Sequence, residues 1–275
     1  MDPAEYAITF ACYGQLEYTR LCVQSMVRHG TPLERLVVVD NGSKDATRAY
    51  LDTLPLGGRI YNSDNLGCGV AWNQGALALQ AEWTIVMNND VLVSAGWIEG
   101  LIGAAREHGV RVISPSLVEG PLDYDFDAFA ARASHDMRDA LRLGWCHAVC
   151  LAVHKSVWLE IGYFQPVPAL LGYEDTMFFH EMDKAGIRGA TTGASWLHHF
   201  GSMTQSAMKQ ERGLAQKDGL GHRYNYRLLG KSWLRRKWDK LQRTRELDAW
   251  RDAELARYGM TMRGQAQPGG AITWT

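Results

Sequence analysis

"LERLVVVDNGS", residues 33–43, is the stretch that decides the fold. Its unbroken run of Leu and Val is typical of a strand that is buried on both faces. The run stops at a polar turn, and KDATRAYLDTL (44–54) then has a helical composition, with Ser43 or Asp45 able to cap its first turn. A buried strand that leads directly into a helix indicates an α/β protein.

Similar units lie on both sides of this stretch. Apolar runs predict strands at 7–13, 58–67 (a strand and its loop) and 83–90, and the spacing of apolar residues predicts helices at 16–30 and 68–80. This alternation predicts a Rossmann-like, mostly parallel sheet covered by helices on both faces. Because the connections are short, we expect strands that follow each other in the chain to be adjacent.

After residue 110 the pattern is less regular. We expect a strand and a short helix over 146–164, and an amphipathic helix over 172–189 that begins with Glu174 and Asp175 and stops at Gly186. The chain therefore divides into a main α/β domain over 1–221, a basic and aromatic helical segment over 222–265, and a flexible tail over 266–275.

The composition argues against several classes of protein. With 46% hydrophobic and 21% charged residues the chain has an ordinary globular composition, and its net charge of −1 argues against general binding of nucleic acid. No apolar run approaches the roughly 20 residues of a membrane span, and MDPAEYAITF lacks the layout of a signal peptide. The five cysteines form no CxxC pair, which favours reduced thiols and a cytoplasmic location.

Three polar clusters follow the predicted strands at equivalent positions: Asp40-Asn41, Asp64-Asn65 and Asn88–Asp90. Any one of them alone would be interpreted as a surface turn. In an open parallel sheet, however, the carboxyl ends of the strands form the edge at which ligands bind. The three clusters together therefore indicate one crevice lined by carboxylate and amide oxygens.

Five segments carry a resemblance to a known family. They follow one another in the order seen in family 2 glycosyltransferases: ITFACYGQLEYTRLCVQSM, VVVDNGSKDATRAYL, NSDNLGCGVAWNQGAL, VMNNDVLVSAGWIEGL and GYEDTMFFHEMDKAGIRGATTGASWLHHFGSMT. The resemblance spans roughly residues 6–205. It is similar to enzymes of GT-A fold that build bacterial polysaccharides, including rhamnosyltransferase-like members, and it implies that the main domain is catalytic.

The resemblance implies a donor pocket for a nucleotide sugar. Asp40 corresponds to the residue that contacts the nucleotide base, and the backbone around Cys12 and Tyr13 forms the rest of that pocket. Further donor contacts are implied for Asn65, Asn73 and Asn89. One departure lies in the first motif, which has Gly14 where the family often has Asn.

The resemblance also implies a metal site. Asn88-Asn89-Asp90 stands where the family has its DxD-type motif, so Asp90 and Asn88 would hold Mg²⁺ or Mn²⁺ together with His199 or its neighbour His198. Such a cation neutralises the charge that develops on a leaving diphosphate. Magnesium typically takes only one or two carboxylates from the protein, so Asp90 can suffice. Asn88 in place of Asp lowers the local negative charge, which disfavours strong metal affinity.

The ED pair completes the implied machinery. Asp175 corresponds to the base that deprotonates the acceptor hydroxyl, and Glu174 would orient the acceptor. The implied activity is inverting transfer of a sugar from a UDP- or dTDP-sugar to a glycan or lipid-linked acceptor. One alternative is a sugar nucleotidylyltransferase, but ACYGQLEYTR lacks the glycine- and lysine-rich loop which that class needs. The other is a non-catalytic nucleotide-sugar binding module, against which Asp175 argues.

The basic segment has two interpretations. Its Trp233 and Trp238 alternate with nine basic residues: Arg223, Arg227, Lys231, Arg235, Arg236, Lys237, Lys240, Arg243 and Arg245. Residues 223–245 could form a helix on the inner face of the cell membrane, which would suit an enzyme with a lipid-linked acceptor. Alternatively, the tryptophans pack on the catalytic domain or pair with another subunit in an oligomer.

Overall fold

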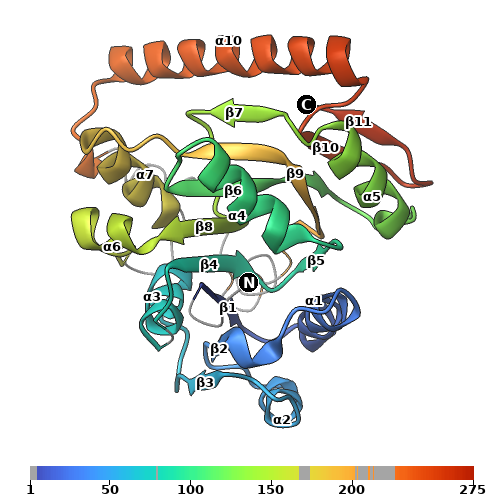
Figure 1. The fold of residues 1–275 in the computed structure, drawn as a ribbon. Helices are drawn as coiled ribbons and strands as arrows, with labels where there is room; N and C mark the ends of the chain where they lie inside the picture. Colours follow the sequence, from blue (N-terminus) through green and yellow to red (C-terminus); the bar gives the residue numbers. More distant parts are fainter. Residues whose placement is uncertain are drawn as a thin grey trace.

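The computed structural model describes residues 5–78, 80–166, 174–201, 203, 210, 213 and 227–275. One mixed sheet runs through the molecule and helices flank it (Figure 1). Its main path has the order β11-β10-β6-β8-β4-β1-β2-β3, and β5, β7 and β9 join it off this path. The predicted α/β class is confirmed.

The first four strands match the sequence prediction closely. They are β1 (Tyr6–Cys12), β2 (Leu36–Asp40), which follows the 3₁₀ turn Leu33–Arg35, β3 (Gly58–Tyr61) and β4 (Trp83–Asn88). All four are parallel, but β4 pairs with β1 and not with β3, so the expectation that successive strands are adjacent was wrong for β4. Its connection, α3 (Cys68–Ala78), packs across β1 and β2 and carries the chain to the other side of β1. Such a change of direction opens a crevice at the strand ends.

Helices cover both faces of this part of the sheet. On one face lie α1 (Leu16–Arg28) and α4 (Trp97–Glu107), whose apolar side chains pack on Ile8, Phe10 and Ile85. The short α2 (Thr47–Asp52) adds Leu51 to the same core cluster. On the other face, α3 packs with α6 (Lys155–Ile161) and α7 (Glu174–Lys184) around Val86 and Val153. Successive residues of a strand point to opposite faces, so the uninterrupted apolar runs fill both cores.

The second half of the chain extends the sheet with antiparallel pairs. β8 (Cys150–His154) runs antiparallel to both β4 and β6 (Val112–Glu119). β9 (Ala190–His199) lies parallel to β6 and antiparallel to β5 (Val91–Val93) and β7 (Leu141–Leu143). α5 (Phe126–Asp136), capped by Asp125, packs on β9. The predicted stop of α7 is confirmed, because Gly186 follows it at φ +68°.

The C-terminal residues belong to the same sheet. The predicted basic helix is α10 (Trp233–Tyr258), which lies across the molecule above β7 in Figure 1; residues 222–226 lie outside the described part of the chain. The expected flexible tail was wrong, because β10 (Arg263–Ala266) pairs with β6 and with β11 (Ile272–Trp274). Trp274 also packs on Phe129 and Trp196, and this pairing with distant residues orders the last segment.

Candidate functional site

The polar triplet after β4 meets the end of β9. In the antiparallel pairing of β5 with β9, Val91 lies opposite His199, which places the preceding Asp90 beside the imidazole. His199 Nε2 is 3.3 Å from Asp90 Oδ1 and 3.5 Å from the amide nitrogen of Asn88. Asp90 and His199 are both buried. Strand pairing therefore joins two of the predicted metal-site motifs.

A third side chain contacts the other ring nitrogen of this imidazole. Glu119, at the end of β6 and opposite His199 in the parallel register, places Oε1 3.0 Å from Nδ1. Arg263 of β10 donates to the other oxygen of Glu119 at 2.6 Å. Neither residue was predicted from the sequence. Glu119 also lies at a strand end, but its partner Arg263 lies in the segment that was expected to be helical.

The two carboxylates keep a proton on His199. Burial lowers the pKa of this imidazole, but the hydrogen bonds and charges of Asp90 and Glu119 outweigh burial and raise the pKa to about 9. Burial acts to raise the pKa of both carboxyls, yet His199 lowers the pKa of Asp90, and His199 with Arg263 lowers the pKa of Glu119 to about 2. At neutral pH the structure therefore holds an imidazolium between two carboxylates.

This donor set fits a divalent cation. Among the described residues no group of three His, Cys, Asp or Glu side chains forms a closed metal cage. A carboxylate and an imidazole are nevertheless enough for Mg²⁺ or Mn²⁺ when phosphate oxygens and water supply the other ligands. Glu119 accepts a hydrogen bond from Nδ1 of His199, and Nε2 of the same ring faces Asp90. Metal-binding histidines are commonly oriented in this way, by a carboxylate on the ring nitrogen that does not bind the metal. A cation would replace the proton on Nε2.

Two residues of the predicted site point elsewhere. His198 precedes His199 on β9 and therefore faces the opposite side, where its Nδ1 lies 2.9 Å from the Tyr124 hydroxyl. Burial lowers the pKa of His198 to about 4, and Phe200 packs edge-on against its ring. The amide of Asn89 donates to Thr19 Oγ1 at 2.9 Å and so joins the turn to α1. The structure does not bring His198 to Asp90, and it places the Asn89 side chain against α1.

The ED pair opens α7 against the beginning of α3. Glu174 is buried, and its carboxylate accepts hydrogen bonds from the backbone N–H groups of Cys68 and Gly69. A Cβ atom at Gly69 would lie only 3.0 Å from the Glu174 side chain, so the two residues pack tightly. Burial raises the pKa of Glu174, and the charge of Asp175 acts in the same direction. Glu174 thus fixes the first turn of α7, which positions Asp175.

The half-buried Cys68, at the start of α3, lies near the acidic motifs. Its pKa is raised well above the usual value, first by burial and then by the negative charges of Glu174, Asp90 and Asp175. These carboxylates come from the end of β4 and the start of α7, and all lie close enough to act on the same thiol. The metal and base candidates therefore both lie within electrostatic range of the start of α3.

The donor motifs are held together at the ends of β1, β2 and β3. Asp40 is fully buried; it accepts from Arg48 and, at 3.2 Å, from the Ser43 N–H. The amide of Asn41 donates to Asn65 Oδ1 at 2.9 Å. Gly42 has φ +92°, and a Cβ there would lie 2.9 Å from the backbone of Asp64, so the two loops touch.

The loop after β1 is hydrogen-bonded to the loop after β2. The Asn41 N–H donates to the Cys12 carbonyl at 2.8 Å, and the Gly14 N–H donates to the Ser43 hydroxyl at 2.7 Å. Tyr13 is half-buried in this loop. The structure thus brings Cys12, Tyr13, Asp40 and Asn65 together, as predicted. It also adds Arg48, which bridges Asp40 to the Asn62 carbonyl and which no sequence motif identified.

Asn73 has a different placement from the one predicted. Its amide nitrogen donates to the Phe164 carbonyl at 2.8 Å, and its oxygen accepts from the Phe164 N–H at 3.1 Å. These bonds hold the chain that leads from α6 toward α7. The Asn73 side chain therefore binds backbone groups next to the site.

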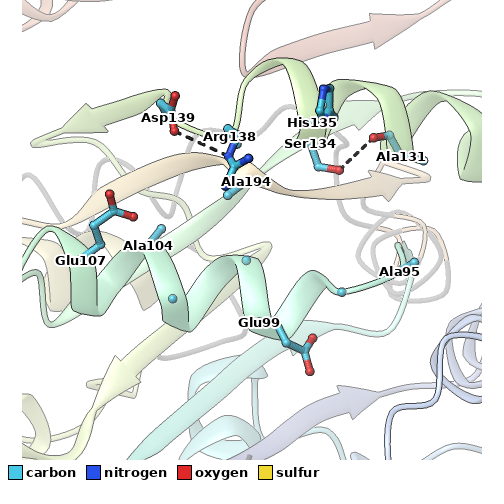
Figure 2. A pocket seen from close by; sticks show the side chains of 13 residues that line it. Ala95, Glu99, Ala104, Glu107, Ala131, Ser134, His135, Arg138, Asp139 and Ala194 are labelled. Carbon is cyan, nitrogen blue, oxygen red and sulfur yellow. Dashed lines mark hydrogen bonds and ion pairs between the residues drawn. The ribbon is translucent and has the colours of Figure 1, made fainter.

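A separate groove of about 500 Å³ lies between α4 and α5 (Figure 2). Gly96, Gly100 and Gly103 form one wall, and the other includes Ser134, which bonds to the carbonyl of Ala131, and Arg138, which pairs with Asp139 at 3.8 Å. None of the predicted site residues lines this groove.

The family model for glycosyl transferase family 2 matches residues 8–154. The chain belongs to glycosyl transferase family 2. The match confirms the resemblance and runs from β1 to the last residue of β8, so it includes Asp40, Asn65 and Asp90. Asp175 and His199 lie beyond it, so the match does not cover their predicted roles.

Solved GT-A glycosyltransferases share the fold of this family member, which confirms the predicted GT-A architecture. GalNAc-T7 with UDP, GalNAc and Mn²⁺ has a TM-score of 0.55 at 14% identity, over 72% of this chain and 44% of that protein. The mannosyltransferase PcManGT from Pyrobaculum calidifontis, in complex with GDP-Man and Mn²⁺, has a TM-score of 0.54 at 17% identity, over 77% and 61%. S. aureus TarS 1–349 with UDP-GlcNAc gives 0.54 at 14% identity, over 74% and 61%.

The chain thus spans between 44% and 61% of these three solved proteins. No curated protein matches the sequence.

Proposed function

We propose that this protein is an inverting, metal-dependent glycosyltransferase. It transfers a sugar from a nucleoside-diphosphate donor, a UDP- or dTDP-sugar, to a hydroxyl of a glycan or lipid-linked acceptor in bacterial polysaccharide synthesis. The observation that carries the proposal is the convergence of Asp90, paired with His199, and Asp175 around the start of α3. A transferase needs a diphosphate-binding cation and a base on opposite sides of one sugar, and these residues can supply both.

The donor lies across the ends of β1, β2 and β4. The loops that carry Cys12, Tyr13, Asp40 and Asn65 form the base end, where the Asp40 carboxylate holds Arg48 and the Ser43 N–H in place. Solved relatives of the same fold were crystallised with UDP, GDP-Man or UDP-GlcNAc, which supports a nucleotide-sugar donor. The diphosphate then extends toward Asp90.

The cation would be Mg²⁺ or Mn²⁺, and Asp90 and His199 would hold it, with Asn88 as a neutral neighbour. When bound, it neutralises the negative charge that the leaving diphosphate gains as the glycosidic bond breaks. Glu119 keeps Nδ1 of His199 protonated, so that Nε2 can face the cation. The Mn²⁺ in two solved proteins of the same fold supports a divalent cation.

Asp175 is the proposed base. It removes the proton of the acceptor hydroxyl while the oxygen attacks the anomeric carbon opposite the leaving diphosphate, so a single displacement inverts the configuration. Glu174 contributes by fixing the first turn of α7 on α3. The enzyme works in the cytoplasm, where nucleotide sugars are made, and contacts the inner face of the membrane through its basic helix.

The test is sugar release from a panel of UDP- and dTDP-sugars, measured with and without Mn²⁺. We expect slow metal-dependent hydrolysis of one donor, and its loss in Asp90→Ala. The exposed Asp136→Ala on α5 is a matched control that should behave as the unchanged protein. Donor binding without any hydrolysis or transfer would indicate a non-catalytic binding module and contradict the proposal.

A further inference from the structure

The two faces of α10 differ in what they contact. The inner face is anchored to the domain: Glu254 accepts two hydrogen bonds from the buried Arg142 of β7, at 2.7 and 2.8 Å. About three turns before Glu254 on the same helix, the guanidinium of Arg243 lies 3.8 Å above the ring of Trp145. The helix is therefore held in one orientation about its own axis.

The opposite face exposes large apolar side chains. Trp233 and Trp238 are 56% and 55% exposed, and Leu234 and Leu241 are 71% and 45% exposed. The alternative that the tryptophans pack on the catalytic domain is therefore wrong. Residues 234, 238 and 241 follow the spacing of one helical stripe. We call Trp233, Leu234, Trp238 and Leu241 the outer patch of α10.

Positive charge coincides with the outer patch. The first half of α10, residues 233–245, contains six Lys or Arg and one acidic residue, Asp239, and Arg227 and Lys231 precede the helix. Asp239 pairs with Lys231 and Arg235, and Lys237 lies 4.0 Å above the ring of Trp233. The rest of the helix, 246–258, has four acidic and two basic residues. Only the first half of α10 thus combines exposed Trp and Leu with a strong excess of positive charge.

We propose that the first half of α10 binds the surface of an anionic lipid membrane. Trp and Leu of the outer patch enter the boundary between head groups and acyl chains, where Trp is favoured, and the surrounding Lys and Arg contact anionic head groups. No helix in the described ranges is both long enough and apolar enough to span a bilayer.

The charge also selects this partner over a second copy of the chain. If two outer patches faced each other, two strongly basic segments would be brought together and would repel each other. A nucleic acid would complement the charge, but it offers no apolar layer for two exposed leucines. An anionic bilayer complements both properties. If the proposed function holds, this contact also brings the site to lipid-linked acceptors.

Vesicle co-sedimentation with the full chain tests the inference. Vesicles of phosphatidylcholine alone are compared with vesicles that also contain phosphatidylserine, at low and at physiological salt. We expect binding to the anionic vesicles only, and weaker binding as salt rises. Lys237→Glu should weaken binding at least about fivefold. The matched charge change Lys155→Glu, at an exposed position on α6, should have little effect.

A second pair of variants tests how the apolar side chains of the outer patch contribute to vesicle binding. The double change Leu234→Ser and Trp238→Ser should abolish binding, whereas Leu159→Ser, at a position 86% exposed on α6, should not. All these side chains are exposed, so the thermal unfolding midpoint should not change. Donor hydrolysis without vesicles should be the same in all variants, which separates a failure of this inference from a failure of the proposed function.

Three results would overturn the inference. Equal binding to neutral and anionic vesicles would remove the role of the basic residues. Loss of binding in the α6 controls as much as in the α10 variants would remove the role of the outer patch. Dimers in sedimentation velocity, or duplex DNA binding, that depend on the outer patch without any vesicle binding would assign it to a different partner.

Discussion

Metal binding at Asp90 and His199 should depend steeply on pH. His199 has a raised pKa of about 9, so at pH 7 its Nε2 carries a proton that a cation must displace. Asp90 and Glu119 are already ionised, because their pKa values are lowered. Each cation bound near pH 7 should therefore release one proton. Well below the pKa, affinity should rise about tenfold per pH unit, and between pH 7 and 9 by about 50-fold, which corresponds to about 2.3 kcal/mol.

Isothermal titration with Mg²⁺ in the presence of UDP measures this directly. Affinities at pH 7, 8 and 9 give the slope, and titrations in buffers of different ionisation enthalpy give the proton count. Glu119→Gln removes one of the two carboxylates that raise the pKa of His199, so the affinity should level off at a lower pH. Glu181→Gln, at a half-buried position of α7 where the carboxylate pairs with Lys184, should leave the profile unchanged. An affinity independent of pH between 7 and 9, or no proton release, would refute this account.

Three further variants test other parts of the structure. Asp175→Asn should lower transfer by about 10²- to 10⁴-fold in a turnover assay and leave UDP binding intact, and unchanged turnover would reject it as the base. Gly42→Ala should destabilise the fold by about 1–3 kcal/mol in thermal unfolding, more than Gly269→Ala, which has a similar φ but open space around it. Glu254→Leu should lower the free energy of unfolding in urea by about 3–5 kcal/mol, because the buried Arg142 loses the carboxylate that pairs with it. The exposed Glu246→Leu should change this free energy little.

The sequence predicted the local features well. The apolar runs of β1, β2 and β4 are buried on both faces, and such strands have the same appearance wherever they lie in a sheet. It did not predict the position of β4, because the choice between the two sides of β1 depends on how α3 packs. The polar clusters did meet at one edge, since parallel strands bring their ends together.

What each polar side chain contacts was harder to predict. His198 and His199 are adjacent in the sequence, and only the pairing of β9 with β5 and β6 decides that His199 faces Asp90. The amides of Asn73 and Asn89 match family motifs, yet they bind the backbone of Phe164 and the hydroxyl of Thr19. Such contacts join residues far apart in the chain, so no local pattern reveals them.

The last segment shows the same limit. RGQAQPGGAITWT contains a turn between two short strands, but neither strand is apolar enough to be recognised alone. Pairing with β6 and packing of Trp274 order it, and through Arg263 it reaches Glu119 beside the metal site.

The most direct test is Mn²⁺ binding, followed by electron paramagnetic resonance with and without UDP. If a cation held at the junction of β4 and β9 receives the donor's diphosphate, UDP should tighten Mn²⁺ binding at least about tenfold in the unchanged chain and in Asp136→Ala, but not in Asp90→Ala. Equal Mn²⁺ affinity with and without UDP, or an Asp90→Ala protein that responds like the unchanged chain, would contradict the account.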